Sequence, residues 1–78
     1  MERDDDVWLV KDLEGQHGEV CYVDKRKAQR FAEQIVGNRA VADTGEILLY
    51  GRGDGSTRLM VRRWPREWAL KGDTPIIP

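Results

Sequence analysis

The chain has 78 residues and a formal net charge of −1 at neutral pH. This length allows one small domain with a thin core, and the single cysteine excludes an internal disulfide that would supplement that core. One cysteine and one histidine are too few for a structural zinc site, so we expect no metal, no cofactor, and either oligomerisation or a monomer with a modest core.

The start of the chain is acidic, and no apolar run approaches the length of a membrane-spanning helix. Neither a signal peptide nor a transit peptide fits residues 1–6, so we expect a cytoplasmic protein without membrane contact. Acidic residues dominate 1–24, and basic residues dominate 25–39 and 52–72. This alternation has two interpretations: either oppositely charged segments face each other within the fold or across a dimer, or the basic segments form a patch that binds an anionic partner. We favour the first interpretation.

The first half of the chain predicts a hairpin followed by a helix. Residues 7–10 and 19–23 are apolar, β-rich runs separated by a glycine-containing turn. After them the period changes, and apolar residues recur with helical spacing at Ala28, Phe31, Ala32, Ile35 and Val36. Asp24 is the expected N-cap, and Gly37-Asn38 is the expected stop, although Val41 and Ala42 allow one more turn.

The second half predicts a second hairpin and a tail. Residues 46–50 and 57–64 read as strands, and Asp54-Gly55 between them favours a type I′ turn. Pro65 supplies no N–H to a ladder, so the last strand should stop at Trp64. The chain therefore divides into an acidic N-terminal tail (1–6), one domain (7–64) and a proline-containing C-terminal tail (65–78) that is irregular and partly docked.

The element order is β-β-α-β-β, which predicts an α+β domain: a four-stranded, mainly antiparallel sheet with one helix on one face. The strand at 57–64 alternates apolar residues with arginine, as expected when one face is covered. The strand at 46–50 is apolar on both faces. Its second face therefore needs cover, from the C-terminal tail, a second subunit or a ligand.

Four features resemble one small bacterial family. They are Trp8-x-Val10, Asp24-Lys-x-x-Ala28 at the start of the helix, Ile47-Leu48-Leu49-Tyr50-Gly51, and Asp54-Gly55. Together they are similar to the domain-of-unknown-function family 2188, whose members are short stand-alone proteins, and the similarity covers residues 7–62. The resemblance implies the β-β-α-β-β order. It implies no activity, because the family has no established one.

Three short motifs are better explained by turn geometry or packing than by chemistry. Arg52-Gly53-Asp54 matches an integrin-binding tripeptide, but chance alone produces it often in a chain this rich in Arg, Gly and Asp. The glycines at 51, 53 and 55 precede a strand, whereas phosphate-binding loops precede a helix. His17 and Cys21 lie in a turn and a strand, with no third group to orient them. We therefore expect no enzyme and infer no small-molecule substrate.

The strands of the second hairpin carry the residues we expect to bind a partner, on the sheet face away from the helix: Leu48, Tyr50, Arg58, Met60, Arg62 and Trp64. Trp, Tyr, Arg and Met are the types enriched in protein interfaces. Contact with a protein partner or with a second copy, as in a homodimer, is therefore the favoured function. The alternative is a single-stranded nucleic-acid-binding module that stacks bases on exposed aromatics, Tyr22 or Tyr50 among them, between arginines.

Overall fold

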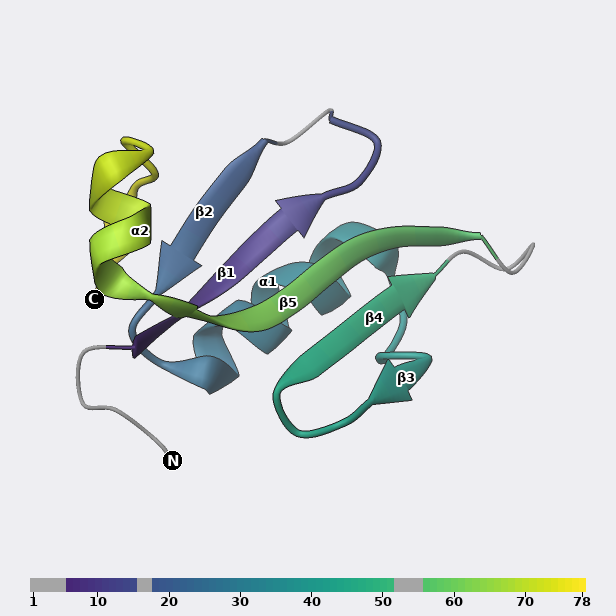
Figure 1. The fold of residues 1–78 in the computed structure, drawn as a ribbon. Coiled ribbons are helices and arrows are strands. Elements are labelled where there is room, and N and C mark those ends of the chain that lie inside the picture. The colour runs from purple at the N-terminus through teal and green to yellow at the C-terminus, as the bar shows by residue number, and fades with distance from the viewer. Residues whose placement is uncertain (1–5, 16–17, 52–55) are drawn as a thin grey trace.

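A computed structural model describes residues 6–15, 18–51 and 56–78, and in this part of the chain it contains one sheet and two helices. The elements in chain order are β1 (Asp6–Asp12), β2 (Glu19–Tyr22), α1 (Lys25–Val36), β3 (Ala42–Asp43), β4 (Ile47–Gly51), β5 (Thr57–Pro65), α2 (Arg66–Lys71) and β6 (Ile76–Ile77). The sheet order is β3-β4-β5-β1-β2-β6, in which only β2 and β6 are parallel (Figure 1).

The α+β class is confirmed, but the expected four-stranded sheet with a single helix is incomplete. The structure adds the two-residue edge strands β3 and β6, which are too short to show a period in the sequence. It also adds α2, which begins directly after Pro65. Proline disfavours helix in the residue before it but is tolerated at a helix start, so the signal that ends β5 also permits α2.

Helix α1 begins and ends where the capping residues predict. The Asp24 carboxylate accepts a hydrogen bond from the backbone N–H of Arg26 at 2.9 Å. Gly37 adopts the left-handed conformation, with φ of 79°, and its N–H donates to the Glu33 carbonyl at 2.7 Å. The helix does not continue to Val41 and Ala42, because the chain turns at Gly37 and Ala42 enters β3.

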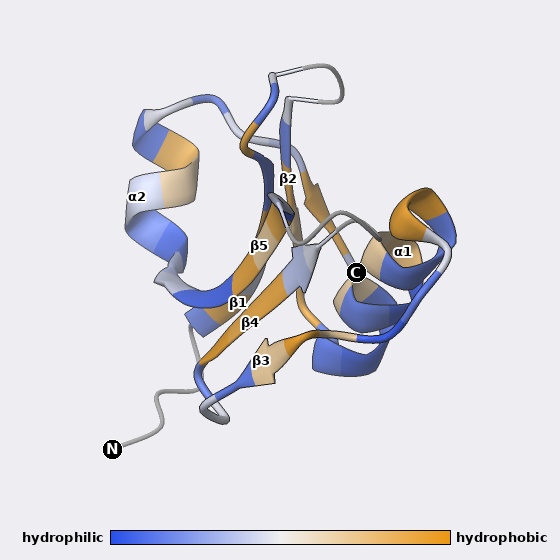
Figure 2. Cartoon of the chain, turned by 90° about the vertical axis from the view of Figure 1, so that its right-hand side faces the viewer, coloured by the Kyte–Doolittle hydropathy of each residue, from blue (hydrophilic) through white to orange (hydrophobic). Residues whose placement is uncertain are grey.

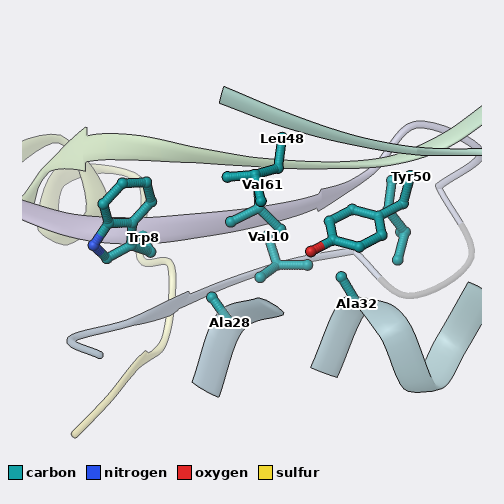
Figure 3. Packing of buried hydrophobic residues seen from close by; sticks show 8 residues of the cluster. Trp8, Val10, Ala28, Ala32, Leu48, Tyr50 and Val61 are labelled. Atoms are coloured by element: carbon teal, nitrogen blue, oxygen red, sulfur yellow. The ribbon is translucent and has the colours of Figure 1, made fainter. Parts of the chain in front are cut away.

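Helix α1 covers one face of the sheet through two small side chains. Ala28 and Ala32 are fully buried, so the helix lies close to the strands. Beneath them lie the buried side chains of Trp8, Val10, Leu48, Tyr50, Leu59 and Val61. Figure 3 shows the ring of Tyr50 between the sheet and α1, close to Ala32. This cluster is the main core.

A smaller cluster lies on the opposite face, beneath α2. Val7, Leu9, Cys21 and Ala69 are buried there, with Trp64 and Ile76 packed against them. Figure 2 shows the sheet edge-on, with α1 on one side and α2 on the other. Strand β1 therefore contributes buried side chains to both faces in alternation, Trp8 and Val10 to one and Val7 and Leu9 to the other.

The C-terminal segment 65–78 docks more extensively than the sequence predicts. Besides α2, it supplies β6, whose backbone is joined to the end of β2: Pro75 accepts from the Cys21 N–H at 2.8 Å, and Ile77 from the Val23 N–H at 3.0 Å. At the other end of the chain, Asp6 is the first residue of β1. The rest of the acidic tail, His17 and the tip of the second hairpin, including the expected Asp54-Gly55 turn, lie outside the described residues.

The close approach of α1 to the sheet predicts that enlarging a buried alanine is destabilising. Ala32→Leu should lower the free energy of unfolding by about 1–3 kcal/mol, because the added atoms must displace the neighbouring core side chains. Leucine is nearly as good a helix former as alanine, so the loss will not come from propensity. Urea unfolding measures it. Gln34→Leu, at an exposed position of the same helix, is the control and should change stability little. Equal stability of the two variants would contradict close packing at Ala32.

Candidate functional site

The pairing of β4 with β5 sorts the side chains of the second hairpin onto the two faces. Leu48 lies opposite Val61 and Tyr50 opposite Leu59, and all four belong to the buried cluster beneath α1. The expectation that Leu48 and Tyr50 share an exposed face with Met60 and Arg62 is therefore wrong. Leu48 is 1% exposed and Tyr50 is 0% exposed, so neither contributes to a surface. The physical reason is the register, which pairs even-numbered residues of β4 with odd-numbered residues of β5.

The other four alternating positions form a surface on the α2 side of the sheet. Ile47 lies opposite Arg62, and Leu49 opposite Met60. We call these four residues the open strip. Each is partly exposed, and none belongs to the buried cluster beneath α1 or to the one beneath α2. Helix α2 packs on β1, β2 and the end of β5, so its cover stops short of β4 (Figure 2).

An aromatic pair marks the border between α2 and the open strip. The rings of Trp64 and Trp68 meet edge to face, with centroids 5.1 Å apart. Trp68 is 52% exposed, so the pair presents apolar area to solvent beside the strip. The Arg62 guanidinium carbon lies 5.3 Å from the centre of the Trp64 ring, within cation–π range. The strip and the two tryptophans are therefore one continuous surface.

Arg62 is the unbalanced charge of this surface. Its Nε is buried and has no hydrogen-bond partner, and the guanidinium forms no ion pair, within the described part of the chain. A buried donor without an acceptor costs roughly 1–3 kcal/mol. Two other cations on the strands of this face have acids beside them: Arg58 lies 3.5 Å from Glu14, and Lys11 lies 3.8 Å from Glu19. Arg62 is thus a partly exposed cation without an ion pair to a described residue.

The structure brings together part of the expected binding set. Met60, Arg62 and Trp64 share the α2 side with Arg58, whose guanidinium is held by Glu14. Tyr22 lies on the other side, where its ring centroid is 5.8 Å from that of Phe31. Sequence reasoning missed Ile47, Leu49 and Trp68. Alternation along β4 groups Ile47 with Leu49 and the pairing with β5 sets their face, whereas Trp68 is carried by the unexpected α2.

Cys21 has the surroundings of a core residue. Its side chain is fully buried beneath α2. Burial, and secondarily the charge of Glu19, raises the pKa of its thiol to about 11, so the reactive thiolate is disfavoured at neutral pH. Among the residues described, no three His, Cys, Asp or Glu side chains cluster as metal ligands, and no helix is long and apolar enough to cross a membrane.

No family model matches the chain, and neither a curated protein nor a solved structure matches it significantly. The resemblance to family 2188 therefore stays a prediction.

The isolated guanidinium predicts that Arg62 weakens the fold. Arg62→Met keeps a long, unbranched side chain but removes the unpaired buried donor. We expect the free energy of unfolding to rise by up to roughly 1 kcal/mol, since the relief exceeds the lost cation–π contact with Trp64. Urea unfolding measures the change, with Arg30→Met on the exposed side of α1 as the matched control. A clear loss of stability in Arg62→Met alone would assign Arg62 a structural role instead.

The buried phenol of Tyr50 predicts a pH-dependent stability. Its hydroxyl has no hydrogen-bond partner among the described residues, and burial, followed by the charges of Glu33 and Asp43, raises its pKa from 10 to about 12. The folded chain therefore holds the phenol proton more tightly than the unfolded chain, and stability is full below about pH 10 and falls as the pH rises to about 12. At about pH 11 the loss due to Tyr50 should be about 1 kcal/mol.

Tyr50→Phe tests this assignment. The variant should be about 1 kcal/mol more stable than the parent near pH 8, because an unpaired buried hydroxyl is removed. Its advantage should grow on going to pH 11, because it lacks the ionising phenol. Urea unfolding of both proteins at the two pH values gives the comparison. The effect of lysine titration on stability is the same in both proteins and cancels in the difference. A parent and variant that lose equal stability between the two pH values would rule the mechanism out.

Proposed function

We propose that this chain is a non-enzymatic binding module whose open strip contacts another protein, either a different partner or a second copy. The observation that carries the proposal is the half-covered second face of the sheet. Its β1 and β2 half lies beneath α2, while Ile47, Leu49 and Met60 remain partly exposed on β4 and β5. A sheet face lined with apolar side chains is stabilised by cover, and a protein partner supplies it.

The chemistry of the surface supports a protein partner. Methionine, tryptophan and arginine are the types that protein interfaces enrich, and truncation of tryptophan or arginine there is often costly. Met60, Arg62, Trp64 and Trp68 gather these types within one continuous surface. The open strip adds the flat aliphatic area of Ile47 and Leu49 to them. The combination of an apolar centre with one cation at its edge is typical of a specific contact.

Binding of single-stranded nucleic acid is the weaker candidate on this surface. Arg58 and Lys11 lie beside Glu14 and Glu19, so two of the strand cations of this face are already paired with acids. Backbone binding requires several free cations, and its affinity falls steeply with salt. Titration of labelled single strands at low and high salt tests it. Tight, salt-sensitive binding that Arg62→Gln weakens would favour this function over the protein contact.

The protein contact is tested by making the open strip polar. Leu49→Glu places a charge at its centre, and Gln34→Glu on the exposed side of α1 is the matched control. Sedimentation velocity reports self-association, and selection from a displayed library of unconstrained peptides reports binding to a different chain. We expect Leu49→Glu to weaken whichever contact is found at least about tenfold, or about 1.4 kcal/mol. The control should leave it unchanged.

A strictly monomeric chain whose selected peptides bind both variants as tightly as the parent would refute the proposal. Circular dichroism and urea unfolding of Leu49→Glu establish that the fold is intact, so that a lost contact reflects the surface. Met60→Gln, which removes apolar character without adding charge, gives a second and milder change at the neighbouring position.

A further inference from the structure

We infer that the partner of the open strip is an amphipathic helix of a different protein, lying beside α2 and carrying an acidic side chain that meets Arg62. This inference rests on the proposed function and names the partner's chemistry. Three observations carry it: the width of the uncovered sheet, the unpaired guanidinium, and the way in which the chain's own helices are already used.

The width of the uncovered sheet fits one helix. Neighbouring strands lie about 4.7–4.9 Å apart, so β3, β4 and β5 together span about 10 Å, close to the diameter of a helix with its side chains. Helix α2 reaches β1 and β2 through Ala69, which packs against Val7, Leu9 and Cys21, and it contacts the end of β5 through the Trp64–Trp68 pair. A second helix over the strip would therefore lie beside α2. Trp68 would form the wall between them.

Arg62 specifies the charge of that helix. Its paired residues on the adjacent strands are Leu9 of β1 and Ile47 of β4, so the residues beside Arg62 in the sheet are apolar. The partly exposed guanidinium forms no ion pair with a described residue, and its contact with Trp64 places it beside the strip. A carboxylate accepts the parallel N–H groups of a guanidinium in a bidentate pair, which is among the strongest polar contacts in proteins. An acidic residue at the edge of the helix's apolar stripe supplies it.

A second copy of the chain fits the strip less well. Both described helices already turn their small apolar residues onto their own sheet, α1 through Ala28 and Ala32 and α2 through Ala69. Neither is free to cover the strip of another copy. In a twofold-symmetric dimer that pairs the open strips of two copies, Arg62 would approach Arg62 of the other copy. This is a like-charge contact without a carboxylate between the two guanidinium groups. The helix must therefore come from another protein.

A displayed library of helical peptides provides the test. Each peptide carries apolar residues at i, i+3, i+4 and i+7, and its flanking positions vary among Glu, Lys, Gln and Ala. The library is selected on the full chain, with Leu49→Glu as the counter-target. We expect the enriched peptides to keep a glutamate at one flank of the stripe. Changing that glutamate to lysine should weaken binding at least about tenfold, as expected for loss of a charge-assisted pair.

Charge reversal on the protein distinguishes a specific pair from general attraction. Arg62→Glu should reverse the preference, so that the lysine peptide binds better than its glutamate parent. Arg62→Gln should weaken binding of the glutamate peptide without strengthening binding of the lysine peptide. Arg30→Glu, at an exposed position of α1, makes the same change in net charge and should leave the preference as it was. Urea unfolding of each variant confirms that the fold is retained.

The outcomes separate this inference from the proposed function. If unconstrained peptides bind in a Leu49-dependent way while helical ones do not, or if helical binders are indifferent to Arg62→Glu, the acidic helix is refuted and the binding surface stands. If the chain self-associates through the strip, the foreign partner is refuted. If the chain is monomeric and neither library yields binders that depend on Leu49, both proposals fall.

Discussion

The constraint on which this structure depends is that β1 is buried on both faces. Trp8 and Val10 point to one side of the sheet and Val7 and Leu9 to the other, and all four are nearly inaccessible to solvent. A strand of this kind is stable only at the centre of a sheet with cover on both sides. Helix α1 supplies one cover. The other falls to the six residues of α2, and so short a helix leaves β4 and most of β5 uncovered on that face.

The covered and bare halves of the second face divide the polar side chains as well. Where α2 packs, the buried thiol of Cys21 is protonated and apolar in behaviour. Toward the turns of the two hairpins, Lys11 and Arg58 lie beside acids. At the boundary, Arg62 has no ion pair with a described residue, and its Nε lacks a hydrogen-bond partner. A residue that weakens the fold where it stands is understandable if it contributes to something other than the fold, and stability is commonly sacrificed at working surfaces.

Local signals in the sequence predicted the local structure well. Asp24 and Gly37 bound α1 because capping depends on a few adjacent residues. Alternation along β4 places Leu48 and Tyr50 on one face, but which face that is depends on the pairing with β5, whose register shifts between Tyr50 and Gly51. Leu48 and Tyr50, expected on the exposed face, are buried beneath α1 instead. The isolation of Arg62 was not predictable, because it depends on β1 pairing with β5 and on where α2 ends.

Strand β6 has a consequence for how the chain tolerates its bare apolar surface. It forms one edge of the sheet, and Pro75 and Pro78 stand on either side of its two residues. Proline has no N–H, so an incoming strand would find at most two backbone donors along this edge. The opposite edge, β3, is equally short. Sheets that grow into fibrils extend strand by strand through such edges, and neither edge here offers a template long enough to begin. The molecule can therefore leave the apolar open strip uncovered without polymerising through its backbone.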